Sequence, residues 1–285
     1  MPISLTIAQS ATLTCLWEVM APKAGNVHRG ADFADLTLAD FAASAVAIGP
    51  AMQAAADGER LGRVVLSAIE ATRAVTRTNT NLGIVLLLAP LAKAPRDVPL
   101  APGVRQVLDE LDPDDSRLVY DAIRLAEPGG MGKAPEHDVA GSPPPDLLSA
   151  MRLAAERDMV ARQYAAGFED VLQVILPWLA EGLARRWRLS DLIVHTHLRI
   201  VSHWPDSLIA RKCGVAVAQK ASDWAAEVLA SGNPDEQTFH ETLADLDFWL
   251  RSDHNRRNPG TSADLITAAL FAALREGVIE LPVKW

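Results

Sequence analysis

Valine and isoleucine never form alternating runs in this chain, and this absence constrains its fold more than any other sequence feature. A half-buried strand needs apolar residues at every second position, and β-branched and aromatic residues favour it. Leu, Ala, Arg, Asp and Glu dominate instead, with only 6 Phe and 2 Tyr. Apolar residues recur at helical spacing. The sequence therefore predicts an all-α protein, a single globular domain over residues 1–285 with roughly ten to twelve helices.

Breaks in the apolar pattern set the expected helix boundaries. Pro22 ends the first pattern, and Thr37 with Asp40 predicts a capping box for the second. The run from Leu82 to Leu91 is hydrophobic nearly all round, which predicts a central position. The predicted helices cover residues 5–20, 37–56, 59–75, 82–91, 104–111, 115–126, 147–164, 168–186, 189–203, 207–230, 236–250 and 262–277.

Residues 127–146 show no apolar period, and Gly141-Ser142-Pro143-Pro144-Pro145 is typical of an extended linker. Structureless segments longer than ~12–15 residues within a domain are commonly lids, binding loops or disorder. We expect a mobile loop here, and it contains the carboxylate of Glu136.

Charge and cysteine content exclude several classes of protein. The formal net charge of −9 argues against a nucleic-acid-binding surface, although a locally basic pocket for an anionic ligand is compatible with it. Cys15 and Cys213 are the only cysteines, so neither a disulfide framework nor a structural zinc site is expected. The apolar run from Ile84 to Ala92 is shorter than the ~20 residues of a membrane span. We expect a cytoplasmic protein without a membrane partner.

The loop from Ala21 to Asp35 concentrates ionisable groups between two apolar helices, where functional residues often lie. Its cations could neutralise a polyphosphate, and an amide could hold a sugar or phosphate oxygen. Its carboxylates could bind Mg²⁺ or act as acid and base. Solvated loop charges are the alternative explanation. The candidate residues are Lys23, Asn26, His28, Arg29, Asp32 and Asp35.

A second candidate is Thr78-Asn79-Thr80-Asn81-Leu82-Gly83, which opens the most hydrophobic predicted helix. The N-terminus of a helix offers unpaired N–H groups and a partial positive charge, which suits phosphate. The alternative is that Thr78 or Asn79 only caps the helix.

Two further helix starts combine acids with cations. Asp206 precedes Arg211 and Lys212, and it is either a catalytic or metal-binding group or an N-cap. Asp264 has the same ambiguity, because S/T-x-x-D is also a cap signal. A basic turn, Arg256-Arg257-Asn258-Pro259-Gly260, comes directly before it.

His195, His197 and His203 are interpreted as core or surface histidines. The first two are about 200° apart on a helix at ~100° per residue, so they cannot share a metal-ligand face. The sequence has no P-loop, no GxGxxG after a strand and no GxSxG elbow. Nucleotide chemistry in this chain would therefore need a less common, helical site.

Five stretches in order resemble the triphosphoribosyl-dephospho-CoA synthase family, which makes the prosthetic-group precursor of citrate lyase and malonate decarboxylase acyl carrier proteins. They begin at Pro22, Thr78, Pro128, Asp206 and Asn258, and they extend to Leu265. They are Pro22-Lys23-Ala24-Gly25-Asn26-Val27 with the acids beyond it, Thr78-Asn79-Thr80-Asn81-Leu82-Gly83, Pro128-Gly129-Gly130 with Glu136, Asp206-Ser207-Leu208-Ile209-Ala210-Arg211, and Asn258-Pro259-Gly260-Thr261-Ser262-Ala263-Asp264-Leu265.

The resemblance implies an all-α transferase of the 5-triphosphoribosyl unit of ATP. In the family reaction the 2′-hydroxyl of 3′-dephospho-CoA attacks the anomeric carbon, and adenine leaves. Such a reaction needs Mg²⁺, cations for the triphosphate, and a general acid and base. On this resemblance the catalytic candidates are Asp32, Asp35, His28, Asp206 and Asp264; the substrate-binding candidates are Lys23, Asn26, Arg29, Thr78, Asn79, Asn81, Arg211, Lys212 and Asn258; the metal candidates are Glu136, Asp206 and Asp264.

This chain departs from the pattern of the lyase-associated enzymes within the presumed site. Asn26 and His28 stand where those enzymes typically have leucine and aspartate, and Asn81 and Leu82 replace a basic pair. A divergent ribosyltransferase with another acceptor, for example in pterin-type cofactor synthesis, is the first alternative. A non-catalytic helical nucleotide-binding protein is the second. The oligomeric state is left open, with a homo-oligomer among the alternatives.

Overall fold

The computed structural model describes residues 5–129 and 141–285. All secondary-structure elements assigned in these two ranges are helices. The predicted all-α fold is confirmed. The described ranges contain fifteen α-helices and one π-helical segment, η1. Their bounds are α1 Ile7–Met20, α2 Leu38–Ala47, α3 Gly49–Ala56, α4 Leu61–Val75, α5 Leu82–Lys93, α6 Leu100–Asp109, α7 Pro113–Ala126, α8 Leu147–Ala154, α9 Met159–Ala166, η1 Asp170–Ile175, α10 Leu176–Ala184, α11 Leu189–His203, α12 Ser207–Cys213, α13 Val215–Ala230, α14 Gln237–Arg251 and α15 Gly260–Arg275.

There are more α-helices than predicted because three predicted helices are each divided into two α-helices. The helix predicted over 168–186 is also divided, into η1 and α10. Pro50 lies at the start of α3, directly after the end of α2. Gly214, with φ +94°, separates α12 from α13. Between α8 and α9 the chain turns, and the Asp158 carboxylate caps α9 by accepting hydrogen bonds from the N–H groups of Val160 at 2.9 Å and Ala161 at 3.0 Å. Each of these three breaks lies within an apolar pattern that looks continuous in the sequence.

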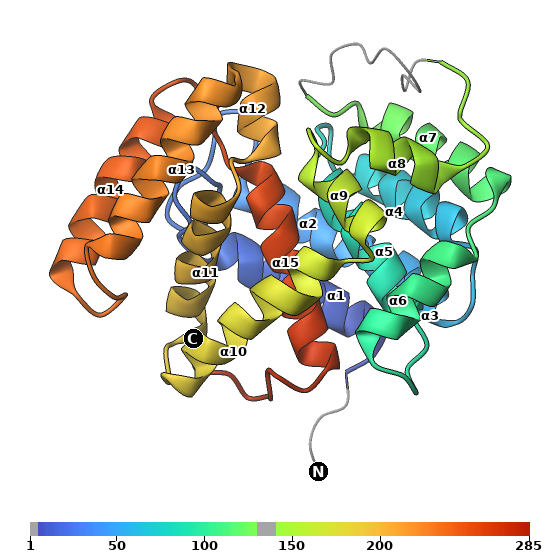
Figure 1. Cartoon of the computed structure of the whole chain (residues 1–285), viewed down its shortest axis with the longest axis horizontal. Coiled ribbons are helices and arrows are strands. Elements are labelled where there is room, and N and C mark those ends of the chain that lie inside the picture. Colours follow the sequence, from blue (N-terminus) through green and yellow to red (C-terminus); the bar gives the residue numbers. More distant parts are fainter. Residues whose placement is uncertain (1–4, 130–140) are drawn as a thin grey trace.

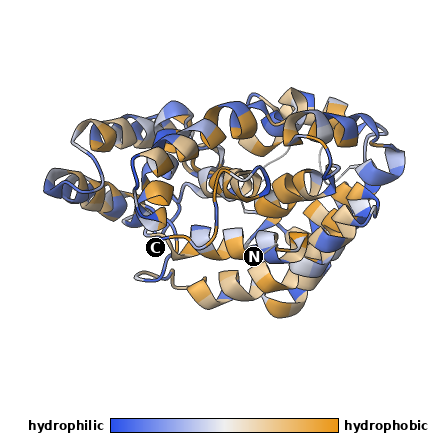
Figure 2. Cartoon of the chain, turned by 90° about the horizontal axis from the view of Figure 1, so that it is seen from below, coloured by the Kyte–Doolittle hydropathy of each residue, from blue (hydrophilic) through white to orange (hydrophobic). Residues whose placement is uncertain are grey.

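Helix α15 lies at the centre of the molecule, with α11–α14 on one side and α4–α9 on the other (Figure 1). It is buried from Leu265 to Ala273 and contacts α1, α5, α10 and α11. Helix α5 is buried from Ile84 to Ala92, so the predicted central position is confirmed. Most helices carry both hydrophobic and hydrophilic residues (Figure 2). That is the pattern expected where one face of each helix packs inward.

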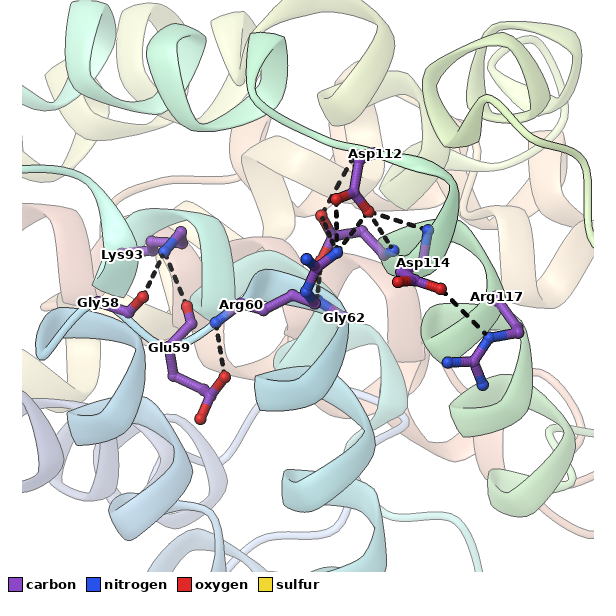
Figure 3. Close-up of polar contacts among 9 residues, drawn as sticks. Gly58, Glu59, Arg60, Gly62, Lys93, Asp112, Asp114 and Arg117 are labelled. Carbon is purple, nitrogen blue, oxygen red and sulfur yellow. Dashed lines mark hydrogen bonds and ion pairs between the residues drawn. The ribbon is translucent and has the colours of Figure 1, made fainter.

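The start of α4 is tied to α7 and to the end of α5 by polar contacts. Arg60 Nη1 donates to Asp112 Oδ2 at 2.6 Å, and Lys93 Nζ donates to the Glu59 carbonyl at 2.7 Å (Figure 3). Gly62 permits close packing, since a Cβ at this position would lie 2.7 Å from the Asp115 backbone. These contacts fix the start of α4 and the end of α5. At the opposite ends of the two helices, the connection over residues 76–81 lines a cavity.

Within the described ranges, one helical stretch has the length and apolar composition of a membrane span, Leu38–Ala56. It consists of α2 followed by α3, and both contact α1 and α4. Helices of a protein core satisfy the same criterion of length and composition, and 33% of this stretch's apolar window is buried.

The predicted mobile loop over 127–146 falls partly outside the described ranges, and Glu136 with it. Residues 141–146 have no helix and are tied to α7, because Ser116 Oγ donates to the Pro144 carbonyl at 2.5 Å. Asp146 then caps α8 through the N–H groups of Leu148 and Ser149.

Candidate active site

A cavity of about 1280 Å³ lies where the N-termini of α5 and α15 meet, and α4, α7, α8, α9 and α12 complete its walls. Its described lining is richly charged, with seven cations and five acids in a chain whose net charge is −9. The cations are Arg73, Arg77, Arg124, Arg157, Arg211, Lys212 and Arg256, and the acids are Glu18, Asp35, Glu127, Asp158 and Asp264.

The structure brings nine of the predicted site residues together on this lining. The others are Lys23, His28, Arg29, Asp32 and Asp206, which lie elsewhere, and Glu136, which is outside the described ranges. The nine are Asn26, Asp35, Thr78, Asn79, Asn81, Arg211, Lys212, Asn258 and Asp264.

The N-terminus of α5 forms part of the cavity wall. Asn79 Oδ1 accepts hydrogen bonds from the N–H groups of Asn81 at 3.3 Å and Leu82 at 3.0 Å. Asn79 thus satisfies the first N–H group of α5, while Asn81 occupies the N-cap position. Asn81 Nδ2 donates to Thr72 Oγ1 at 3.1 Å, whereas Asn81 Oδ1 is buried without a hydrogen-bond partner in the described residues. A buried polar atom without a partner is costly, and one on a cavity wall is available to a ligand or a water molecule.

Asp264 projects from the second turn of α15 toward Gly83. A Cβ atom at Gly83 would lie 2.0 Å from Asp264 Oδ2, so the carboxylate occupies the space that any other residue at position 83 would fill. It receives no hydrogen bond from the described residues, and it does not cap α15. Burial, together with the negative charges of Glu18 and Asp206, raises the pKa of Asp264 well above its usual value.

Lys23, predicted to bind phosphate, points into the core instead. Its side chain is completely buried, and Nζ lies 2.8 Å from Glu18 Oε1 and also donates to the Glu18 carbonyl. A buried ammonium needs such a partner because desolvation of an isolated charge is very costly. Glu18 is the member of the pair that lines the cavity. Burial raises the pKa of the Glu18 carboxyl, and the charge of Lys23 opposes this effect.

The rest of the Ala21–Asp35 loop is held mainly by structural contacts. The Gly25 N–H donates to Asp247 Oδ1 at 2.7 Å, and Arg251 donates to the Asn26 carbonyl. Asn26 Nδ2 lies 3.4 Å from Nε2 of the buried His197. This histidine is therefore part of the core, as the sequence indicated.

Three predicted catalytic or binding residues of the loop lie away from the cavity lining. Asp32 Oδ1 accepts from the Leu38 N–H at 2.7 Å at the start of α2, and His28 Nδ1 accepts from the Gly30 N–H at 3.1 Å. Burial and the charge of Arg251 lower the pKa of His28. Arg29 is exposed. Among the loop's predicted residues, Asn26 and Asp35 line the cavity.

Asp206, predicted to be catalytic or to bind metal, has the N-cap role that is the alternative explanation for this residue. It is fully buried, and its two oxygens accept four hydrogen bonds. Oδ1 accepts from the N–H groups of Leu208 at 2.8 Å and Ile209 at 3.0 Å; Oδ2 accepts from Ser262 N and Oγ, both at 2.8 Å. One carboxylate thus joins the starts of α12 and α15, and both of its oxygens are committed to that contact.

Arg211 and Lys212 are presented to the cavity by α12. Asp158 Oδ2 accepts from Arg211 Nη1, while Arg211 Nε is buried without a hydrogen-bond partner in the described residues. Lys212 Nζ donates to Asn258 Oδ1 at 3.2 Å. Burial and the charge of Arg211 lower the pKa of Lys212. The Asn258 amide, the Lys212 ammonium and the Arg211 guanidinium form one wall that is rich in hydrogen-bond donors. Such a wall suits the anionic oxygens of phosphates.

Comparison with known proteins agrees with the resemblance in the motifs. The family model for ATP:dephospho-CoA triphosphoribosyl transferase (CitG) matches residues 4–281. This chain belongs to that family. A crystal structure assigned to a triphosphoribosyl-dephospho-CoA synthase from Archaeoglobus fulgidus is 28% identical, with a TM-score of 0.65, and the alignment covers 83% of this chain and 99% of that one. No curated protein matches the chain.

Several cavity residues of this triphosphoribosyl transferase family member were missed by the sequence analysis. Arg73 and Arg77 are spaced i, i+4 directly before the Thr78 motif, and this spacing could have indicated them. Glu18 lies in an apolar helical pattern, and only the fold shows that its face borders a cavity. Arg124, Arg157, Asp158 and Arg256 come from separate helices and connections, without a shared sequence signal.

Proposed function

We propose that this protein transfers the 5-triphosphoribosyl unit of ATP to the 2′-hydroxyl of 3′-dephospho-CoA. The bond between N9 of adenine and C1′ of ribose breaks, and its electron pair stays with adenine. A new bond forms between the acceptor oxygen and C1′. The hydroxyl proton is lost to a base, adenine gains a proton, and the triphosphate remains on the transferred ribose.

The observation that carries this proposal is the size and charge of the cavity. Pockets for one small ligand typically enclose ~300–1,000 Å³, and about 1280 Å³ leaves room for two substrates side by side. A transferase that passes a unit directly from donor to acceptor needs both in one site. Seven lining cations suit the triphosphate of the donor and the diphosphate of the acceptor.

Phosphate binding is assigned to cations that converge from separate elements. Arg211 and Lys212 come from α12, and Arg73 and Arg77 come from the end of α4 and the residues after it. Asp158 orients the Arg211 guanidinium. The N-terminus of α5 adds the unpaired Asn81 Oδ1, which can accept from a ribose hydroxyl or an adenine amino group.

Asp264 is assigned the role of general acid. Its raised pKa favours the protonated form, which can donate to adenine as the glycosidic bond breaks. Asp35 is the candidate base, because it lines the same cavity and is exposed to it. A general acid and a general base each contribute ~10²–10⁴-fold in rate.

Mg²⁺ is proposed to enter with ATP. No group of three or more His, Cys, Asp or Glu in the described ranges could hold a metal ion by itself, and the Asp206 oxygens are fully occupied. Mg²⁺ is commonly held by one or two carboxylates together with substrate phosphates. Because Asp264 holds its proton as the general acid, Asp35 is the predicted acid on the lining that could complete such a site, and bound Mg²⁺ would supply charge neutralisation of the triphosphate.

The test is adenine release from Mg·ATP, followed by chromatography with and without dephospho-CoA. We expect adenine release that depends on the acceptor, and a product heavier than dephospho-CoA by one triphosphoribosyl unit. Adenine release with another acceptor only would favour the divergent ribosyltransferase. Intact ATP under all conditions, with measurable ATP binding, would favour a nucleotide-binding protein.

A further inference from the structure

One part of the cavity is apolar, and we call it the apolar arm. It lies between α5, α7, α8 and α9, where α8 contacts α7 and α9 and α9 contacts α5. These helices lie together on one side of α15 (Figure 1). The apolar arm is lined by Leu86, Tyr120, Ile123, Leu147, Met151 and Ala161.

The shape of the apolar arm suits an extended chain. Leu147, Met151 and Ala154 follow each other on one face of α8, all on the cavity lining. From residue 147 to residue 154 a helix rises by roughly 10 Å, at ~1.5 Å per residue. A wall of that length is longer than one purine ring. Leu82 and Leu86, one turn apart on α5, continue the apolar surface toward the polar N-terminus of that helix.

Two cations of the described lining, Arg124 and Arg157, come from α7 and from the residues that follow α8, beside the apolar arm. Arg124 follows Tyr120 and Ile123 on the same face of α7, and its Nη1 lies 3.0 Å from Asp121 Oδ1. The Arg124 side chain is 36% exposed, while Tyr120 is 5% exposed. Arg157 follows α8 and is exposed. A ligand that fits therefore has an anionic group directly joined to a long uncharged chain.

We propose that the apolar arm binds the pantetheine chain of the acceptor, with its diphosphate between Arg124 and Arg157. The inference rests on the proposed function. In dephospho-CoA the uncharged pantetheine chain is bonded directly to the diphosphate, whereas in ATP the adenine is separated from the phosphates by ribose. Only the acceptor thus matches a cationic rim that leads into an apolar slot. The adenosine of the acceptor then extends toward Asp264, where its 2′-hydroxyl reacts.

The test uses two acceptors that share adenosine and a diphosphate, dephospho-CoA and ADP, with Ala154→Phe as the variant. The larger side chain fills the apolar arm from α8, where Ala154 is partly buried. We expect at least a tenfold rise in KM for dephospho-CoA, with KM for ATP and for ADP as acceptor unchanged. A tenfold rise in KM corresponds to a loss of ~1.4 kcal/mol in binding free energy. Excluding two methylene groups of the pantetheine chain from the apolar arm, at ~0.8 kcal/mol each, is enough to produce that loss. Ala155→Phe, one residue later and off the lining, is the matched control.

Arg157→Gln provides the second measurement, and it should weaken both acceptors to a similar degree through the shared diphosphate. A rise in KM for ATP with Ala154→Phe, or equal effects on the two acceptors, would overturn the assignment. If the wild-type protein transfers to neither acceptor, the proposed function fails, and calorimetric binding then tests the apolar arm separately. Tighter binding of dephospho-CoA than of ADP, lost in Ala154→Phe but kept in Ala155→Phe, would still support it; equal affinities in the wild type would refute it.

Discussion

The glycine at position 83 is expected to be required for activity but not for folding. Gly83 lies in the first turn of α5 without a positive φ, so an alanine there suits the backbone and gains up to ~1 kcal/mol in helix propensity. The new Cβ would nevertheless lie 2.0 Å from Asp264 Oδ2 and 2.6 Å from its Cγ. Both atoms belong to the carboxyl group of Asp264, so that group must move while the backbone can stay in place. Stability should therefore change by less than ~1 kcal/mol, because the strain of a displaced rotamer and the helix gain are of similar size.

The effect of Gly83→Ala on activity should be much larger. Displacing the carboxyl of Asp264 removes the general acid, which predicts a ~10²–10⁴-fold loss of kcat in the adenine-release assay. Such a loss corresponds to ~3–5 kcal/mol in the activation barrier. The KM for ATP should change little, because the phosphate-binding cations are not displaced.

A double-variant comparison shows whether Gly83→Ala acts through Asp264. If it does, Gly83→Ala combined with Asp264→Asn should be no slower than Asp264→Asn alone, because both remove the same group. Gly49→Ala, at a helical glycine away from the cavity whose nearest contact would be 3.3 Å, is the matched control and should keep full activity. Wild-type kcat in Gly83→Ala, with unchanged urea unfolding, would refute the assignment of Asp264.

Four other variants or conditions separate structural from substrate-binding roles. Lys23→Met should lower the free energy of unfolding by ~3–5 kcal/mol in urea titrations, because it leaves Glu18 buried without its cation; unchanged stability with a raised KM for ATP would show a phosphate ligand instead. Asp206→Ala should cost ~2–4 kcal/mol by the same measurement, through two lost helix caps and an unpaired buried hydroxyl, and native-like unfolding would contradict the double cap. Arg211→Gln should raise the KM for ATP about tenfold or more, given ~1.5–3 kcal/mol for a charge-assisted hydrogen bond, and an unchanged KM would remove it from the site. Its partly exposed ion pair with Asp158 should cost at most ~1 kcal/mol of stability when it is lost. Burial lowers the pKa of His197 from 6.5 to about 3. The unfolded chain therefore binds the imidazole proton more tightly, and His197 alone should reduce the free energy of unfolding by ~2 kcal/mol as the pH falls from 7.5 to 5. A His197→Asn variant should show a correspondingly weaker pH dependence of unfolding.

Much of the local structure could be predicted from the sequence because it depends on neighbouring residues. Thr37 and Asp40 form the expected capping box, with the Thr37 N–H donating to Asp40 Oδ2 at 2.9 Å. Asn79 accepts a hydrogen bond from the first N–H group of α5, as its short polar side chain suggests. The missed breaks at Asp158 and Gly214 lie inside continuous apolar patterns. There the cap, rather than the periodicity, decides where a helix ends.

The site was less predictable because its contacts join residues far apart in the chain. Asn26 meets His197 across 171 residues, and Asp206 meets Ser262 across 56. The same loop of the sequence contains Lys23, which points into the core, and Asp35, which lines the cavity. Composition and spacing identify both as ionisable loop residues. Only packing determines which side of the backbone meets the cavity.

Asp206 and Asp264 show how two aspartates near helix starts acquire different roles. Each is removed from bulk water and has a raised pKa, with burial as the largest cause. Asp206 faces the N-termini of two helices and accepts four hydrogen bonds, so its oxygens are committed to the fold. Asp264 faces the side-chain-free Gly83 and receives no hydrogen bond from the described residues. A half-buried carboxyl with unused oxygens, on the wall of a cavity lined by cations, can exchange a proton with a bound substrate. This difference in available donors makes Asp264 the better candidate for catalysis.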